Sequence, residues 1–135
     1  MARNLDRTSH RGDRVSVWLW AAVGAGGSVG AIGRFLLDSL VAEHAGRDFP
    51  YGTFAVNISG TLILGVLTGS SLAGNVLLIA GTATIGSYTT FSTWMLESHR
   101  LAEDRQFRRA RLNLGVSLFV GFGAAFVGHA IGAQL

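Results

Sequence analysis

The distribution of charged residues divides the chain into its predicted elements. Between Asp48 and Glu97, 48 consecutive residues include no Asp, Glu, Lys or Arg. A helix that crosses the hydrocarbon core of a bilayer needs roughly 20 apolar residues, so this run is long enough for two crossings. The small and polar residues from Thr68 to Asn75 favour a turn in the middle of the run. We therefore expect a helical hairpin buried in a membrane.

A similar apolar segment lies on each side of this hairpin. Pro50 suits the first turn of a helix, where its missing N–H is not needed. The predicted fold is an all-α membrane protein of four transmembrane helices, with both termini and the 68–75 loop on one side of the membrane. The expected spans are 15–40, 50–67, 76–96 and 112–135.

Composition supports this fold and excludes several others. Hydrophobic residues make up 49% of the chain and charged residues 14%, which is too apolar for a soluble domain of this size. Without cysteine the chain has no disulfides or thiolate sites, and we find no Ser-His-Asp set, metal-ligand cluster or phosphate loop with a Lys. An enzyme is not expected. Residues 1–14 are predicted to be a polar N-terminal tail, and 15–135 a four-helix transmembrane unit.

All eleven cationic side chains are arginines, and all except Arg34, near the end of the first span, flank the apolar segments as topology signals do, so no nucleic-acid partner is expected. Four lie on the side of the termini and six on the opposite side, which is a weak bias. Insertion in both orientations, with two copies paired as an antiparallel dimer, is one interpretation; a single orientation favoured by two charges is the other. The two groups are Arg3, Arg7, Arg11 and Arg14, and Arg47, Arg100, Arg105, Arg108, Arg109 and Arg111.

The third expected span has an unusual density of hydroxyl groups. Gly81 and Gly86, together with β-branched threonines, favour an interruption of the helix at mid-membrane. Carbonyls freed by an interruption need a partner, and backbone oxygens suit a hard cation. The alternative is that the hydroxyls bond to the preceding turn and only bend the helix. The seven hydroxyl residues are Thr82, Thr84, Ser87, Thr89, Thr90, Ser92 and Thr93.

Other polar and aromatic residues of the spans have two interpretations each. Asn57, one turn after Thr53, offers two N–H donors and an acceptor, and either binds an anion or joins helices. Phe91 and Trp94 share a helix face, where their positive ring edges either contact a small anion or pack ordinarily. Arg34 either pairs with Asp38, one turn further on, or extends its side chain to the membrane interface.

Three blocks of residues together resemble the signature of a known family. They begin at Gly26 (GGSVGAIGR), Gly52 (GTFAVN) and Gly86 (GSYTTFSTW), and fall in order on the first three spans. The chain resembles the Fluc (CrcB) fluoride channels, which implies that residues 15–135 are a four-helix transmembrane channel subunit. That resemblance implies dual-topology, antiparallel dimers of four-helix subunits that export fluoride passively across the cell membrane and reduce its cytoplasmic toxicity. It also implies a structural sodium ion, not transported, held by backbone carbonyls of the broken third helices.

The resemblance assigns roles by position. The carbonyls of Gly86 and Thr89 would coordinate sodium, and Arg34 would stand in the vestibule. Trp94 occupies the place of a second pore phenylalanine, and Ser87-Tyr88 replaces the commoner Gly-Phe. These departures leave two partners open, a second copy of the chain or a related subunit with which it forms a heterodimer. The fluoride pore would be lined by Asn57, Phe91, Trp94, Thr53, Ser92, Thr93 and Ser117.

Two other functions fit a four-span chain. A small multidrug/proton antiporter needs an ionisable group within the membrane, whereas Asp38 lies near the end of the first span and His129 near the end of the last, where we expect it to be interfacial. A non-conducting membrane subunit is the other alternative.

Overall fold

The computed structural model describes residues 17–46 and 48–135; the predicted tail with its arginines, and Arg47, lie outside the described residues. Every regular element in this part of the chain is helical, which confirms the predicted all-α class. The elements are α1 (Val17–Ala45), α2 (Tyr51–Gly69), α3 (Asn75–Leu77), the π-helix η1 (Leu78–Ile85), α4 (Gly86–Tyr88), α5 (Phe91–Glu103) and α6 (Phe107–Gly132).

Among the described residues, three helices are long and apolar enough to cross a membrane: α1, α2 and α6. The helices α1 and α6 extend beyond the predicted spans, since α1 ends at Ala45 instead of residue 40 and α6 begins at Phe107 instead of 112. Hydropathy marks where a chain leaves the hydrocarbon core, while helical hydrogen bonding continues through the polar residues outside it. The region expected to form the third span is built from the short consecutive elements α3, η1 and α4, followed by α5.

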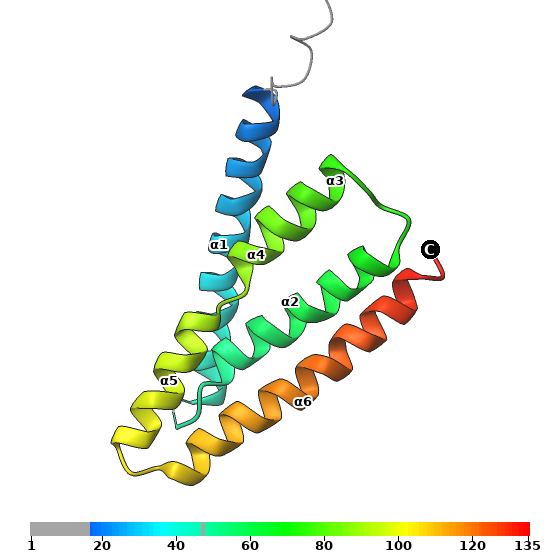
Figure 1. The fold of residues 1–135 in the computed structure, drawn as a ribbon. Coiled ribbons are helices and arrows are strands. Elements are labelled where there is room, and N and C mark those ends of the chain that lie inside the picture. Colours follow the sequence, from blue (N-terminus) through cyan, green and yellow to red (C-terminus); the bar gives the residue numbers. More distant parts are fainter. Residues whose placement is uncertain (1–16, 47) are drawn as a thin grey trace, which may run out of the picture.

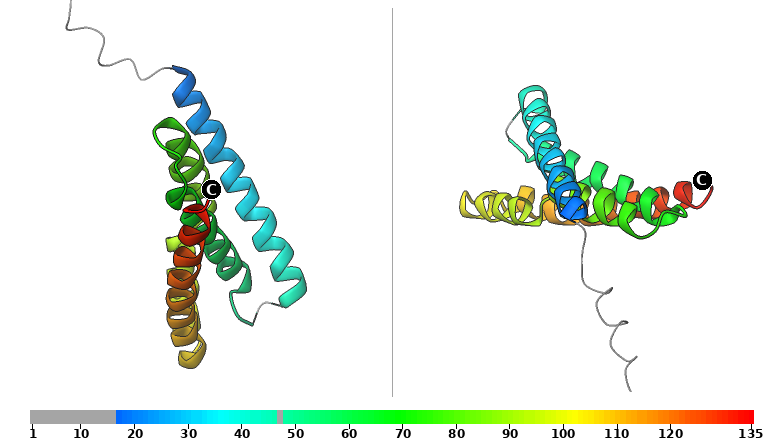
Figure 2. Two further views of the ribbon diagram at one scale, coloured as in Figure 1. Left: turned by 90° about the vertical axis from the view of Figure 1, so that its right-hand side faces the viewer. Right: turned by 90° about the horizontal axis from the view of Figure 1, so that it is seen from above.

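The helices form a flat layer with one helix laid across it. Figure 2 shows α2, α6 and the segment from α3 to α5 side by side in the layer, and α1 crossing one face at an angle. In that position α1 packs on η1, α2 and α4. The start of α1, the α2–α3 connection and the C-terminus lie toward one end, and the α1–α2 connection and the α5–α6 turn toward the other (Figure 1).

Glycines bring α2 and α6 into direct backbone contact. A methyl group added to Gly128 would collide with the carbonyl of Leu62, and one added to Gly132 would collide with the carbonyl of Val66. Membrane helices lack a hydrophobic driving force between one another and associate through such close packing. This contact fixes α6 against α2. It also places His129 in the last turn of α6 with its side chain exposed.

A second close contact joins α1 to the third helical segment. Gly30 lies against the carbonyl of Thr84 and the hydroxyl of Ser87, and Ser87 Oγ donates to the carbonyl of Gly27 at 2.8 Å. Within η1, Thr84 Oγ1 donates to the carbonyl of Ile79 at 2.9 Å, across the wider turn of a π-helix. The segment that leads into the candidate site is therefore anchored to α1.

Candidate functional site

The third helical segment is interrupted at two residues. After α4 ends at Tyr88, Thr89 (φ −77°, ψ 161°) and Thr90 (φ −148°, ψ 119°) are extended, and α5 begins at Phe91. The Thr90 hydroxyl caps the new helix by accepting from the Thr93 N–H at 3.2 Å. The interruption therefore has defined ends on both sides.

Asn57 of α2 joins this interruption through its side-chain amide. Its Nδ2 donates to the carbonyl of Thr90 at 2.9 Å, and its Oδ1 accepts from the N–H of Thr90 at 2.8 Å. Both backbone groups of Thr90 are thus satisfied by one side chain. Of the two interpretations of Asn57, a joint between helices is observed, and one of its two N–H donors is used in making it.

Two of the hydrogen bonds at the interruption leave two carbonyls without their usual partners. In a continuous α-helix the carbonyl of Gly86 would accept from the Thr90 N–H, and that of Thr89 from the Thr93 N–H. Here the Thr90 N–H is donated to Asn57 and the Thr93 N–H to the Thr90 hydroxyl. The oxygens of Gly86 and Thr89 have therefore lost their regular helical donors. Backbone oxygens of this kind are the ligand type that hard cations prefer.

The hydroxyls of the third segment divide into two groups. Those of Thr84 and Thr89 donate to carbonyls of the preceding turn, which is the local bonding considered as the alternative to an ion path. The Ser87 hydroxyl lies within bonding distance of two carbonyls, that of Ala83 in the preceding turn at 2.7 Å and that of Gly27 in α1 at 2.8 Å. At the start of α5 the hydroxyls bond to one another instead, since Thr90 Oγ1 donates to Thr93 Oγ1 at 3.0 Å and lies 3.4 Å from the hydroxyl of Ser92.

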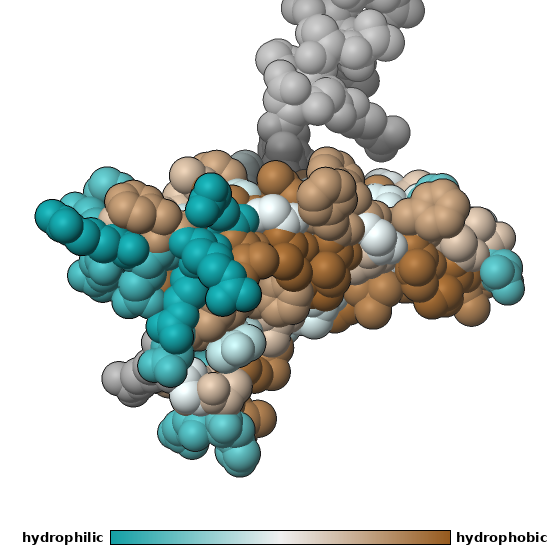
Figure 3. All heavy atoms as spheres, turned by 90° about the horizontal axis from the view of Figure 1, so that it is seen from below, coloured by the Kyte–Doolittle hydropathy of each residue, from teal (hydrophilic) through white to brown (hydrophobic). Residues whose placement is uncertain are grey.

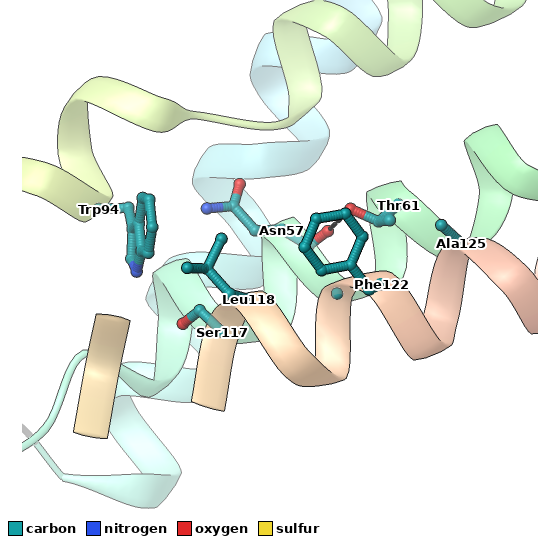
Figure 4. Close-up of a pocket in the computed structure, with 8 residues that line it drawn as sticks. Asn57, Thr61, Trp94, Ser117, Leu118, Phe122 and Ala125 are labelled. Carbon is teal, nitrogen blue, oxygen red and sulfur yellow. Dashed lines mark hydrogen bonds between the residues drawn. The ribbon is translucent and has the colours of Figure 1, made fainter. Parts of the chain in front are cut away.

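A hollow of about 300 Å³ lies beside Asn57. Three residues predicted to line the pore meet there: Asn57 from α2, Trp94 from α5 and Ser117 from α6 (Figure 4). All of its lining residues are uncharged. The remaining members of the lining are Thr61, Leu118, Gly121, Phe122 and Ala125.

The indole of Trp94 is held in a fixed position. Its Nε1 donates to the carbonyl of Asn113 at 3.2 Å, and the side chain is 9% exposed. The ring of Phe91 meets it edge-on, with centroids 5.6 Å apart and planes at 65°. Phe91 itself is 72% exposed. The pair is therefore formed, and the indole N–H is used within the subunit.

Sequence reasoning did not select the two residues that support Trp94. Asn113 is 1% exposed, and its Nδ2 donates to Ser98 Oγ at 2.9 Å. Ser98 Oγ in turn donates to the carbonyl of Trp94 at 2.8 Å. The sequence did hold a signal for Asn113, which is an amide between two leucines, Leu112 and Leu114. A polar side chain buried in such surroundings needs a hydrogen-bond partner.

A second hollow of about 240 Å³ lies between α1, α2 and α5. Arg34, Thr53 and Thr93, all predicted site residues, line it together with Asp38. Thr53 is 3% exposed, and its hydroxyl donates to Glu97 at 2.9 Å. Within the described ranges, no ion pair joins Arg34 to Asp38. Glu97 was missed, although it is the first charged residue after the uncharged run.

The two hollows adjoin the interruption from different sides. Asn57 lines the first and Thr90 lines the second, and the two residues are hydrogen-bonded to each other. The predicted residues Gly86, Phe91 and Ser92 line neither hollow, and each is exposed on the single chain.

Comparison with known proteins gives a consistent result. A family described as "CrcB-like protein, Camphor Resistance (CrcB)" matches residues 21–129. The chain is 50% identical over 120 residues (89% of this chain, 98% of the relative) to a protein of Mycolicibacterium paratuberculosis named "Fluoride-specific ion channel FluC 2". A protein of Symbiobacterium thermophilum named "Fluoride-specific ion channel FluC 1" is 40% identical (84% of this chain, 96% of the relative). A protein of Clostridium acetobutylicum named "Fluoride-specific ion channel FluC 2" is 33% identical (81% of this chain, 93% of the relative).

Proposed function

This chain belongs to the CrcB family, and from that premise we propose that it is a subunit of a fluoride-specific channel in the cell membrane. The channel carries fluoride passively out of the cell and so reduces fluoride toxicity in the cytoplasm. The chain is a multi-pass membrane protein, and its family is one of ion channels, not enzymes.

The observation that carries this proposal is the position of Asn57. Its amide uses one N–H on the Thr90 carbonyl and retains a second, while the residue lines an uncharged hollow with Trp94 and Ser117. A neutral donor held in place by the backbone of the interrupted helix suits a small anion, because its orientation is fixed before the ion arrives.

Neutral groups fit the transport of fluoride for a physical reason. Moving an ion from water into a medium of low dielectric costs tens of kcal/mol by idealised estimates, so close donors must replace the lost hydration. A fixed cation in the path would hold the anion too firmly for it to leave. Amide and hydroxyl hydrogens, with the positive edges of Phe91 and Trp94, are weaker partners from which an ion moves on.

The proposal includes a broken third span and a structural sodium ion that is not transported. Support comes from the carbonyls of Gly86 and Thr89, whose helical donors are engaged elsewhere. These two oxygens would hold the ion, which supplies positive charge between subunits. Two ligands are few for a hard cation, so a second chain in the opposite orientation would complete the set. Exposure of Gly86 and Phe91 on the single chain supports an antiparallel dimer, with itself or with a related subunit.

Fluoride efflux from liposomes that contain only this chain tests the proposal. A fluoride electrode should record rapid release, and Asn57→Ala and Phe91→Ile should each slow it by about tenfold or more, because each removes a group from the path. Both variants should elute like the wild type in size-exclusion chromatography.

A matched control separates this function from its alternatives. Asp38→Asn should conduct fluoride at close to the wild-type rate, whereas a proton-coupled drug exporter that depends on this carboxylate would lose activity. Absence of fluoride release from the wild-type chain alone would exclude a self-sufficient channel. Wild-type release from Asn57→Ala would remove Asn57 from the path.

A further inference from the structure

A groove that shares no residue with the two hollows runs between α5 and α6. Its volume is about 620 Å³. Each helix contributes residues at the spacing i, i+3, i+4 and i+7, so one continuous face of α5 lies along one continuous face of α6. We call it the α5–α6 groove, defined by Met95, Ser98, His99, Ala102, Phe107, Ala110, Arg111 and Leu114.

The groove changes from polar to apolar along its length. The two helices are antiparallel, so residues at equal distances from their turn lie at the same level. Arg111 and His99 are at one level, and Met95 and Leu114 lie deeper. The uncharged run ends at Leu96 and the apolar part of α6 begins at Leu112. The change therefore coincides with the expected boundary between headgroups and hydrocarbon.

The side chain of Arg111 is available for a ligand at this boundary. Its Nε donates to the Phe107 carbonyl at 3.3 Å, which leaves the terminal nitrogens, and in the described part of the chain no ion pair engages it. Arg109 differs, because its guanidinium donates to the Asp48 carbonyl at 3.0 Å and to Gln106 at 2.7 Å. Arg108, one turn before Arg111, and Arg105 add exposed positive charge at the same end.

We propose that the α5–α6 groove binds an anionic phospholipid, whose phosphate is held by Arg111 and whose acyl chain lies along Met95 and Leu114. A guanidinium forms paired, charge-assisted hydrogen bonds with phosphate oxygens. Basic pockets between membrane helices favour anionic lipids, and a hydrophobic surface beyond the charged end suits an acyl chain. Figure 3 shows hydrophilic residues gathered over the α5–α6 turn and hydrophobic residues on the surface beyond it. The proposal does not depend on fluoride transport.

Native mass spectrometry of the full chain, released from bilayers of equal parts phosphatidylglycerol and phosphatidylcholine, tests the site. The wild type should retain phosphatidylglycerol in preference. Arg111→Gln should lower that preference by about tenfold, as expected for the loss of charge-assisted hydrogen bonds. Arg100→Gln, at the same end but on another face of α5, should leave it unchanged. Ala102→Trp, which fills the groove without altering charge, should also reduce lipid retention.

Two results would overturn the proposal. One is an unchanged lipid preference in both Arg111→Gln and Ala102→Trp when each variant elutes as the wild type does. The other is a loss of dimer in Ala102→Trp with no change in bound phosphatidylglycerol, which would mean that a second copy of the chain occupies the groove. Arg111→Lys is the control for misfolding. It keeps the positive charge and should therefore retain more lipid than Arg111→Gln.

Discussion

Trp94 is larger than a phenylalanine at the same place and carries one polar atom, the indole nitrogen, which faces the backbone carbonyl of Asn113. Because Nε1 donates to Asn113, the indole presents only carbon-bound hydrogens to its other neighbours. In the proposed path, Trp94 would therefore present the same kind of ring edge as a phenylalanine while its N–H is bonded to α6. Two further hydrogen bonds join α6 to α5 beside Trp94, from Asn113 to the Ser98 hydroxyl and from that hydroxyl to the Trp94 carbonyl.

Replacing Trp94 by Phe should separate these two roles. We expect fluoride efflux within about threefold of the wild type, since the N–H is not directed into the path, and a loss of stability of about 1 kcal/mol from the broken hydrogen bond. Liposome efflux and thermal unfolding in detergent measure the two effects. Trp94→Ala is the contrasting variant and should lose both flux and stability. A large loss of flux in Trp94→Phe would show that the N–H itself contacts the ion.

At this scale, the sequence indicated which residues matter better than it indicated their partners. Asn57 stood out as an amide in an apolar span, and its two possible roles follow from its donors and acceptor. Its bonds to Thr90 depend on how α2 meets a segment 33 positions away. The partner of the Trp94 N–H lies 19 positions away, on another helix. The pattern of neighbouring residues along the chain does not predict contacts between positions so far apart.

At the scale of elements, hydropathy predicted where the helices lie and not where they end. The uncharged run and its polar turn predicted α2 and the segment from α3 to α5. The start of α6 at Phe107 was missed because Arg108, Arg109 and Arg111 indicate an aqueous boundary, and a helix crosses that boundary without breaking. The π-helical turns of η1, which pack on α1, were also missed, because no local pattern of residues distinguishes them from α-helical turns.

Gly30→Ala tests the contact between α1 and η1. A methyl group there would meet the Thr84 carbonyl and the Ser87 hydroxyl, so the helices must separate, and we expect destabilisation of about 1–3 kcal/mol. Gly24→Ala, in the same helix with nothing within 4 Å, is the control and should be neutral or slightly stabilising. Thermal unfolding of the two variants in one detergent compares them. Equal stability would show that α1 is not closely packed at Gly30.

At the scale of the whole molecule, one chain is a layer with a helix across a single face. Aromatic side chains remain exposed on it, including Phe119 at 82% and Phe126 at 77%. Lipid covers such residues in a membrane, but the carbonyls of Gly86 and Thr89, which have lost their regular helical donors, need polar partners. The proposed ion and second subunit would satisfy that need together.

Exchange of sodium for a bulky organic cation tests this arrangement. If the carbonyls of Gly86 and Thr89 hold sodium between two chains, purification in N-methylglucamine should shift the population from dimer toward monomer. Light scattering after size-exclusion chromatography, at a series of protein concentrations, measures the shift. Readdition of sodium should restore the dimer. A dimer that is equally stable in both salts would exclude this ion as a structural element.

The bonds from Asn57 to both backbone groups of Thr90 have a mechanical consequence. A two-residue gap in a membrane helix would ordinarily act as a hinge, yet bending here must break two hydrogen bonds at once. These two hydrogen bonds therefore hold the interruption rigid. In the proposed channel, a rigid interruption would keep the adjoining path at a constant width, so the fluoride concentration and not a gating movement would set the flux.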